Sequence, residues 1–175
     1  MVSERGFTLV EMMITVALAA ILISVAVPAL NQFTTNARQT GAVNDFVSTI
    51  HIARSMAITT NARVTVCASA GGDACEAVSW DEGWIAFSDA NSNQFVDGTD
   101  AIVASGEGIE GVSIQSGEFG QSLQFRPNGR IAAGAGHFTV CDIRGAEHAK
   151  VIVMDLSGRP RLSSYRADGS SPNCT

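Results

Sequence analysis

The feature that most restricts this chain is an unbroken apolar stretch from Phe7 to Leu30, which contains a single charged residue, Glu11. At a rise of about 1.5 Å per residue, a helix over this stretch is about 36 Å long, and the hydrocarbon core of a bilayer is about 30 Å thick. The stretch therefore predicts a membrane-spanning helix. A carboxylate inside such a helix costs about 2.5 to 3.5 kcal/mol, so we expect Glu11 to have a function and a cationic partner.

Two ordinary interpretations of this N-terminus fit the residues less well. A secretory signal has its small cleavage-site residue after the apolar stretch, whereas Gly6 precedes it. The segment Ala17–Ala19 imitates a cleavage site, but the apolar run continues past it to Leu30. A plain single-pass anchor fits the length and leaves Glu11 without a reason.

The residues Gly-Phe-Thr-Leu-Val-Glu from Gly6 to Glu11 resemble the start of type IV prepilins, as do the short charged leader Ser3–Arg5 and the later Pro28. The resemblance implies that a prepilin peptidase cuts between Gly6 and Phe7 on the cytoplasmic side of the inner membrane and methylates the new amine of Phe7. It also implies that Glu11 attracts the N-terminal amine of a neighbouring pilin during filament assembly. Because Pro28 cannot donate to the helix ladder, we expect the helix to bend or loosen there.

The chain then divides into a leader (residues 1–6), a transmembrane and assembly helix (residues 7–30) and one globular domain (residues 31–175). We expect the helix to continue past the membrane and to end between Thr59 and Asn61. An apolar stripe at three- and four-residue spacing would pack on the chain's own sheet, while the opposite face is polar. The stripe is Val43, Phe46, Val47, Ile50, Ala53, Ala57 and Ile58, and the polar face includes Arg38, Gln39, Asn44 and Asp45.

Short strand-like runs separated by Gly, Asn, Asp and Ser follow the helix, and this spacing predicts antiparallel sheets. The result is an α+β, type IV pilin-like fold in which a long N-terminal helix packs on antiparallel β-sheets. The runs are residues 63–67, 83–87, 101–104, 112–115, 123–126, 138–141, 149–154 and 159–163.

The globular part resembles the GspH/FimT pseudopilins and minor pilins. The segment from Trp80 to Asp89 is similar to a W-x-x-G-W-hydrophobic-x-F-x-D pattern of that family. Phe138–Asp142 and Ser157–Arg161 are similar to its later strands. The resemblance implies a periplasmic domain before assembly, and a cell-surface pilus or a periplasmic pseudopilus afterwards.

Four cysteines, Cys67, Cys75, Cys141 and Cys174, allow three disulfide pairings. An extracytoplasmic domain permits disulfides. We favour Cys67 with Cys75, which closes a small loop, and Cys141 with Cys174, which holds the polar tail. A zinc site lacks a C-x-x-C or a nearby pair of His, so we expect no metal at these cysteines.

Charge is distributed unevenly along the chain, although the net charge is −6. Residues 31–125 have a balance of −8, and residues 126–166 have a balance of +4. Such asymmetry indicates an anionic partner, or alternatively an acidic neighbour in the filament. Within the basic part, Arg159 and Arg161 are two residues apart, so on a strand they would project from one face. Pro160 between them indicates an edge strand.

Two neighbouring guanidinium groups suit phosphate contacts, and the Gly-Arg-Pro-Arg run resembles the G-R-x-R motif of FimT-type minor pilins, which is associated with DNA capture in natural transformation. We therefore expect a minor pilin that binds double-stranded DNA through Arg159 and Arg161, with Lys150, Arg144 and Arg166 widening the patch. The alternative is a structural minor pilin or type II secretion pseudopilin that primes or caps the filament without binding DNA.

Two other functions are disfavoured by the residues. Asp89 to Asp100 spaces oxygen ligands like a calcium loop, yet Gln94 occupies the position that needs Gly and Asp100 replaces a long Glu. A hairpin loop with Asx turns is the better interpretation. The histidines have no evident nucleophile or carboxylate partner, so the sequence predicts neither an enzyme nor a cofactor.

Overall fold

The computed structural model of the protein describes residues 6–98 and 100–174, so the predicted leader residues Ser3–Arg5 lie outside the described residues. The chain divides into two compact units, Met1–Ala37 and Arg38–Thr175. One helix, α1 (Leu9–Thr60), contributes to both units and passes through Pro28 without interruption. Its last residue falls within the range that the sequence predicts.

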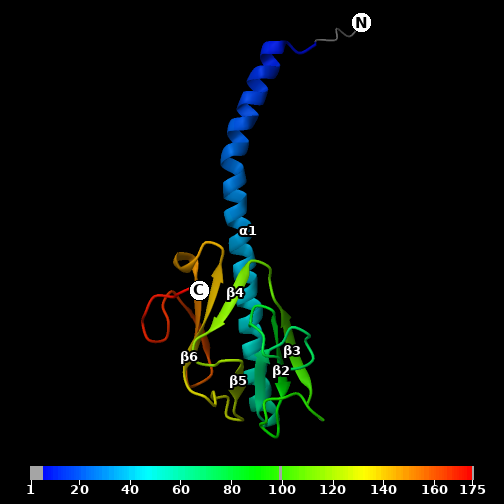
Figure 1. The fold of residues 1–175 in the computed structure, drawn as a ribbon, viewed down its shortest axis with the longest axis vertical. Coiled ribbons are helices and arrows are strands. Elements are labelled where there is room, and N and C mark those ends of the chain that lie inside the picture. Colours follow the sequence, from blue (N-terminus) through cyan, green and yellow to red (C-terminus); the bar gives the residue numbers. More distant parts are fainter. Residues whose placement is uncertain (1–5, 99, 175) are drawn as a thin grey trace. The chain divides into compact units, whose positions relative to one another are not determined.

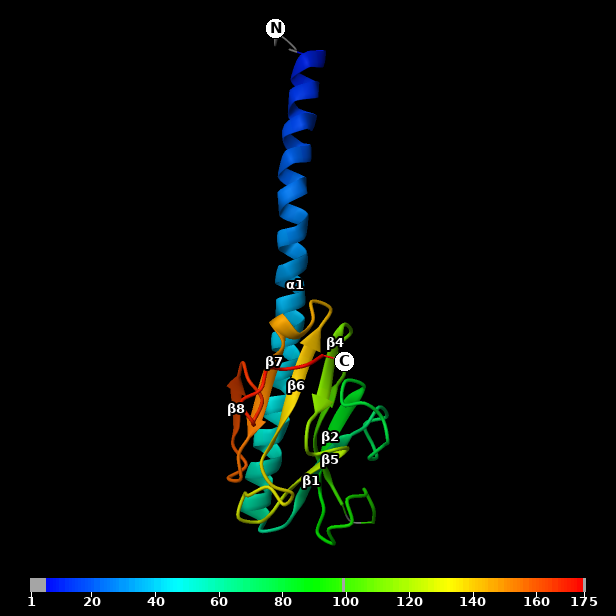
Figure 2. The same ribbon diagram turned by 60° about the vertical axis from the view of Figure 1, so that its left-hand side comes forward.

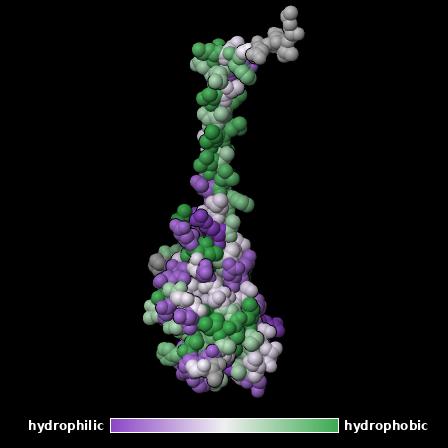
Figure 3. Space-filling model, turned by 90° about the vertical axis from the view of Figure 1, so that its right-hand side faces the viewer, coloured by the Kyte–Doolittle hydropathy of each residue, from purple (hydrophilic) through white to green (hydrophobic). Residues whose placement is uncertain are grey.

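The first unit is helical and has its apolar side chains exposed. Phe7, Leu9 and Leu22 are each 70% exposed or more, and the hydrophobic side chains of this segment are visible in Figure 3. Among the described residues, α1 is the one helix that is long and apolar enough to cross a membrane. A hydrophobic surface of this kind requires lipid or neighbouring helices to cover it.

The second unit contains two four-stranded antiparallel sheets, in the orders β3-β2-β1-β5 and β4-β6-β7-β8 (Figures 1 and 2). Each of the eight predicted strands is present within a few residues of its expected position. The strands are β1 (Val64–Ala68), β2 (Gly83–Ser88), β3 (Ile102–Glu107), β4 (Val112–Ser116), β5 (Ser122–Phe125), β6 (Gly136–Asp142), β7 (Lys150–Met154) and β8 (Pro160–Ser163).

The second half of α1 packs on these sheets through Phe46, which is fully buried. Its ring meets those of Trp80, Trp84 and Phe138 edge to face, at centroid distances of 5.5, 5.0 and 4.8 Å. Aromatic pairs prefer this geometry because the positive edge of one ring meets the negative face of another. The predicted helix stripe is thus largely the inner face, except that Ile58 is 44% exposed.

Gln39 was expected on the polar face of the helix, and that prediction is wrong. It is 1% exposed, and its Nε2 donates to the carbonyl oxygens of Val140 and His148 at 3.2 and 2.9 Å. These carbonyls lie under the helix and need a donor there, because an unpaired buried carbonyl is costly. A polar residue is therefore required at a position where the helical pattern alone suggests solvent.

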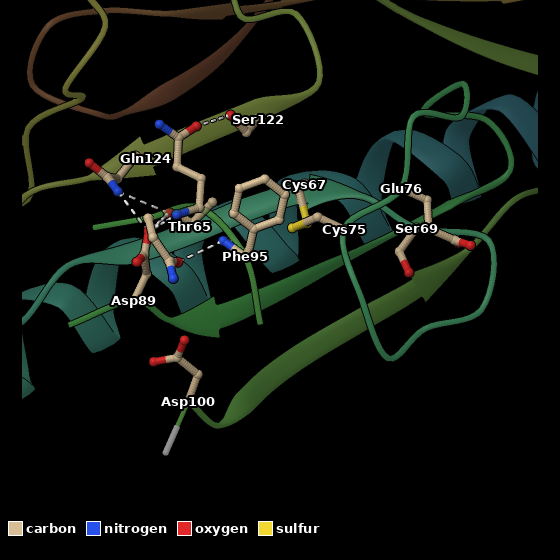
Figure 4. The surroundings of a disulfide bond; sticks show 12 residues. Thr65, Cys67, Ser69, Cys75, Glu76, Asp89, Phe95, Asp100, Ser122 and Gln124 are labelled. Carbon is tan, nitrogen blue, oxygen red and sulfur yellow. Dashed lines mark hydrogen bonds between the residues drawn. A yellow bond between two sulfur atoms is a disulfide. The ribbon is translucent and has the colours of Figure 1, made fainter. Parts of the chain in front are cut away.

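Two disulfides have the pairing that the sequence favours. Cys67 on β1 bonds Cys75, and Cys141 on β6 bonds Cys174 near the C-terminus. Figure 4 shows the first bridge beside Phe95. All four cysteines are bonded in this way, so none is free to bind zinc.

Candidate functional site

A tight turn between β7 and β8 carries Arg159, the first residue of the predicted basic pair. Asp155 organises the turn: its carbonyl accepts from the Gly158 N–H at 3.0 Å, and its Oδ1 accepts from the Ser157 N–H at 2.8 Å and the Arg159 N–H at 3.3 Å. Gly158 has φ of 75°, and a Cβ there would lie 2.4 Å from the carbonyl oxygen of Gly129. Only glycine fits this turn, which is seated against the loop that contains Gly129.

Arg54 on α1 joins the same two segments. Its Nε donates to the carbonyl of Gly129 at 3.2 Å and to the carbonyl of Ser157 at 3.1 Å. Arg130 follows Gly129 directly and is exposed, and Arg159 lies two residues after Ser157. Three arginines that are distant in sequence therefore lie in, or within two residues of, the segments that meet at this contact. Together with Arg161 they form what we call the basic turn cluster.

Arg161 lies on β8, the edge strand that Figure 2 shows beyond β7. It is opposite Val153, while the next residue, Leu162, is opposite Ile152 of the core. Because side chains alternate along a strand, Arg161 projects from the sheet face turned away from the core. The strand begins at Pro160, so this alternation applies to Arg161 and does not extend to Arg159. The edge position expected from Pro160 is confirmed.

The charges of Arg159 and Arg161 are available to a partner. Both side chains are exposed, and neither forms an ion pair within 4.0 Å with a carboxylate of the described residues. Asp155 is the nearest acid in the turn. The pKa of Asp155 is lowered, first by the hydrogen bond from the Ser157 hydroxyl and also by the charge of Arg159. The cluster therefore retains a net positive charge beside one ionised carboxylate.

The other three predicted DNA-binding residues are engaged elsewhere. Arg144 forms a two-pronged bond with Asp142, with an Nη2–Oδ2 distance of 2.5 Å, and this bond lowers the pKa of Asp142. Lys150 at the start of β7 donates its Nζ to the Thr40 hydroxyl at 2.7 Å. At about 3.4 Å per residue, the length of β7 separates these groups from the turn at its other end by roughly 17 Å.

Arg166 is half-buried, and its Nη2 reaches the carbonyl of Asn173 at 3.5 Å. It shares a shallow pocket with His137, Glu118 and Asp168. These acidic neighbours offset its charge. The DNA-binding patch predicted from the sequence thus included three residues that are engaged away from the basic turn cluster. It omitted Arg54, because the acid-rich part of the sequence that contains this residue does not indicate a basic site.

The N-terminal residues form a separate feature. The Glu11 N–H donates to the Thr8 hydroxyl oxygen at 3.2 Å, and the Thr8 N–H donates to Glu11 Oε2 at 3.5 Å. This reciprocal pair is a capping box, which begins the helix. Gly6 and Phe7 precede it and are exposed, so the peptide bond between them is accessible.

Comparisons with known proteins agree with these features. A family model described as type II transport protein GspH matches residues 42–158, and a model of the prokaryotic N-terminal methylation motif matches residues 1–27. Among curated protein sequences the comparison finds no match.

The fold is also similar to solved structures of the type IV minor pilin FimU from Pseudomonas aeruginosa (strain PAO1). One crystal form has 18% identity and a TM-score of 0.58 over 82% of this chain and 99% of that chain. A second has 17% identity and a TM-score of 0.56 over 78% and 99%. At this identity the likeness concerns the fold. Because the GspH model spans two thirds of the chain and follows a methylation motif, this chain belongs to the GspH family of type IV minor pilins and pseudopilins.

Proposed function

We propose that this protein is a minor pilin of a type IV pilus that binds double-stranded DNA, without sequence preference, during natural transformation. The observation that carries the proposal is the exposed pair Arg159 and Arg161, which have no ion pair among the described residues and lie at the end of a hydrogen-bonded turn and on the strand that follows it. Guanidinium groups bind phosphate oxygens through charge-assisted and often bidentate hydrogen bonds. Arg54, which bonds the turn, and Arg130, which follows Gly129 in the chain, add positive charge near it.

The N-terminus would bring this domain to the filament. Membership of the pilin family implies peptidase cleavage and assembly with other pilins. We propose cleavage between Gly6 and Phe7, methylation of Phe7 and docking of the new amine of a neighbour on Glu11. Residues 7–30 would hold the protein in the inner membrane, with the globular domain in the periplasm, until it enters the pilus. An unpaired carboxylate in the membrane is costly, and the neighbour's amine would remove that cost.

A site with few cations binds DNA weakly and with a marked dependence on salt. Each phosphate contact adds about 0.9 to the slope of log K against log salt concentration, because each one releases condensed counterions. Weak affinity is sufficient when several copies in a filament act together, since linked sites bind with a high effective concentration.

The test uses the full chain in a non-ionic detergent and a fluorescent duplex, with anisotropy measured over a range of salt concentrations. At low salt the double variant R159A/R161A should bind the duplex more weakly than the wild type does. Its slope of log K against log salt concentration should be smaller in magnitude by about 1.8, because two phosphate contacts are lost. The variant R38A is the control, since Arg38 is exposed and lies outside the basic turn cluster. Binding unchanged in R159A/R161A, or reduced equally in both variants, would show that the cluster is not the DNA site.

Transformation separates this function from a purely structural one. A strain that carries R159A/R161A should keep its pili and lose DNA uptake. Lost pili would favour the alternative of a minor pilin or type II secretion pseudopilin that primes or caps the filament.

A further inference from the structure

The loop between β2 and β3 contains a buried carboxylate that the rest of the fold does not satisfy. Asp89 is 0% exposed. Its Oδ2 accepts from the Thr65 hydroxyl at 2.6 Å, the Gln124 amide at 2.8 Å and the Gln94 N–H at 3.3 Å. Its Oδ1 is buried and has no hydrogen-bond partner among the described residues.

All partners of this carboxylate are neutral. The nearest guanidinium group that bonds this network belongs to Arg63, and its Nη1 donates to the Gln124 oxygen at 2.7 Å rather than to Asp89. A buried charge is costly unless it is paired or binds a metal ion. A cation at Oδ1 would supply the missing partner.

The rest of the loop, which Gln94 joins to Asp89, brings further oxygen atoms together. Asn91 and Asn93 each donate a side-chain N–H to Asp97 Oδ2, so these three side chains converge. Each amide oxygen accepts one backbone N–H, that of Asn93 at 3.2 Å and that of Phe95 at 2.9 Å, and keeps a second lone pair. Asp97 Oδ1 is likewise left for another partner.

The conformation removes the main objection that the sequence raised against a cation. In the calcium-loop pattern the sixth position needs glycine for a sharp turn. Here Gln94 occupies that position with φ of 63°, so it adopts the left-handed conformation that glycine would take. Its side chain is held by the Ser122 hydroxyl, which donates to the Gln94 oxygen at 2.5 Å. Val96 packs on the buried cluster of Cys67, Ile85 and Phe87, which fixes the middle of the loop.

We propose that this loop binds one calcium ion. Carboxylate, amide and carbonyl oxygens in this alternating spacing are the donors that Ca²⁺ prefers, and the first, third, fifth, seventh and ninth positions supply them. No group of three or more His, Cys, Asp or Glu side chains among the described residues could hold a metal ion. The ligand set is therefore limited to two carboxylates with amide and carbonyl oxygens, and these hard donors suit Ca²⁺ better than zinc or copper. The ligands are the side chains of Asp89, Asn91, Asn93 and Asp97 and the carbonyl of Phe95, and Figure 4 shows Asp89 beside Thr65 and Gln124.

Affinity should be that of an extracellular module, with a Kd of about 10⁻⁴ to 10⁻³ M, because the last ligand is a short Asp rather than a bidentate Glu. The experiment is calorimetric titration of the full chain with calcium chloride, after treatment with a chelator, in a non-ionic detergent. One ion should bind per chain, and the thermal midpoint should rise with calcium concentration.

The principal variant is D97N, because Asp97 is exposed and the substitution keeps the shape of the side chain. It should weaken calcium binding at least tenfold with an unchanged circular dichroism spectrum. D73N makes the same substitution at an exposed acid outside the loop and should bind like the wild type. R159A/R161A should also retain calcium binding, which separates this site from the DNA site.

The proposal is overturned if the wild type shows neither binding heat nor a thermal shift up to about 10 mM calcium, tenfold above the weakest expected Kd. It is also overturned if D97N binds as well as the wild type. Equal affinity for magnesium would overturn it too, since Mg²⁺ requires a stricter octahedral site.

Discussion

Replacing Phe46 with alanine should be among the most damaging single substitutions in the globular domain. The side chain is 0% exposed, and three aromatic rings surround it at centroid distances between 4.8 and 5.5 Å. Truncation of a buried Phe costs about 3 to 5 kcal/mol in unfolding free energy. Rings held by two sheets cannot collapse easily into the cavity, so we expect about 4 to 5 kcal/mol. This is a large part of the roughly 5 to 15 kcal/mol that stabilises a typical domain.

The assay is urea unfolding of the full chain in detergent, followed by tryptophan fluorescence. Trp80 and Trp84 are 3% and 1% exposed, so both report the loss of the core directly. F46L keeps most of the volume and should cost about 1 to 1.5 kcal/mol. F95A is the matched control, because Phe95 is 66% exposed and its truncation should stay within about 0.5 kcal/mol.

One result would refute this reasoning. If F46A lost no more unfolding free energy than F95A, the helix would not be held to the sheets by this ring. The slope of the unfolding free energy against urea concentration must also be the same in F46A as in the wild type. A changed slope would mean that the variant no longer unfolds in the same transition.

Three further predictions concern other contacts. Removal of the Cys141–Cys174 bridge, which spans 33 residues, should lower the unfolding free energy by about 3.7 kcal/mol. Removal of the Cys67–Cys75 bridge, which spans 8 residues, should lower it by about 2.5 kcal/mol. Both values are measured by urea unfolding of variants in which the two cysteines of a bridge are replaced by alanine. The bond from Arg144 lowers the pKa of Asp142 in the folded protein, so its stabilising effect should be complete above about pH 4 and lost as the pH falls through the lowered value. The stability difference between wild type and D142N should therefore be constant from pH 7 to about pH 4 and shrink toward pH 3. G158A should cost at least about 1 to 2 kcal/mol for its left-handed backbone and should weaken DNA binding although every arginine remains.

The sequence allows the helix, the eight strands and both disulfides to be predicted, because each depends on local patterns or on few alternatives. Gln39 shows where this reasoning fails. Its burial depends on two carbonyls contributed by Val140 and His148, more than 100 residues away. A helical periodicity records only which faces are apolar, and it cannot reveal a buried acceptor that calls for an amide.

The residues of the candidate site also divide into those that local sequence patterns predict and those that only the folded chain brings together. Arg159 and Arg161 could be named from the sequence because they are adjacent to a glycine and a proline with known conformational effects. Arg54 could not, because its role arises from hydrogen bonds to Ser157 and Gly129 that only the folded chain brings together. Lys150 was included for its charge, and its bond to Thr40 could not be foreseen.

The two proposed sites occupy different sheets, and this separation has a physical consequence. The basic turn cluster adjoins β8, whereas the calcium loop connects β2 with β3, the edge strand of the other sheet. A ligand at one site makes no contact with the elements that form the other, so their effects on stability should add. Calcium would strengthen an edge hairpin whose outer strand, β3, has no buried residue. The arginines would then remain free to bind phosphate in a domain made more resistant to unfolding.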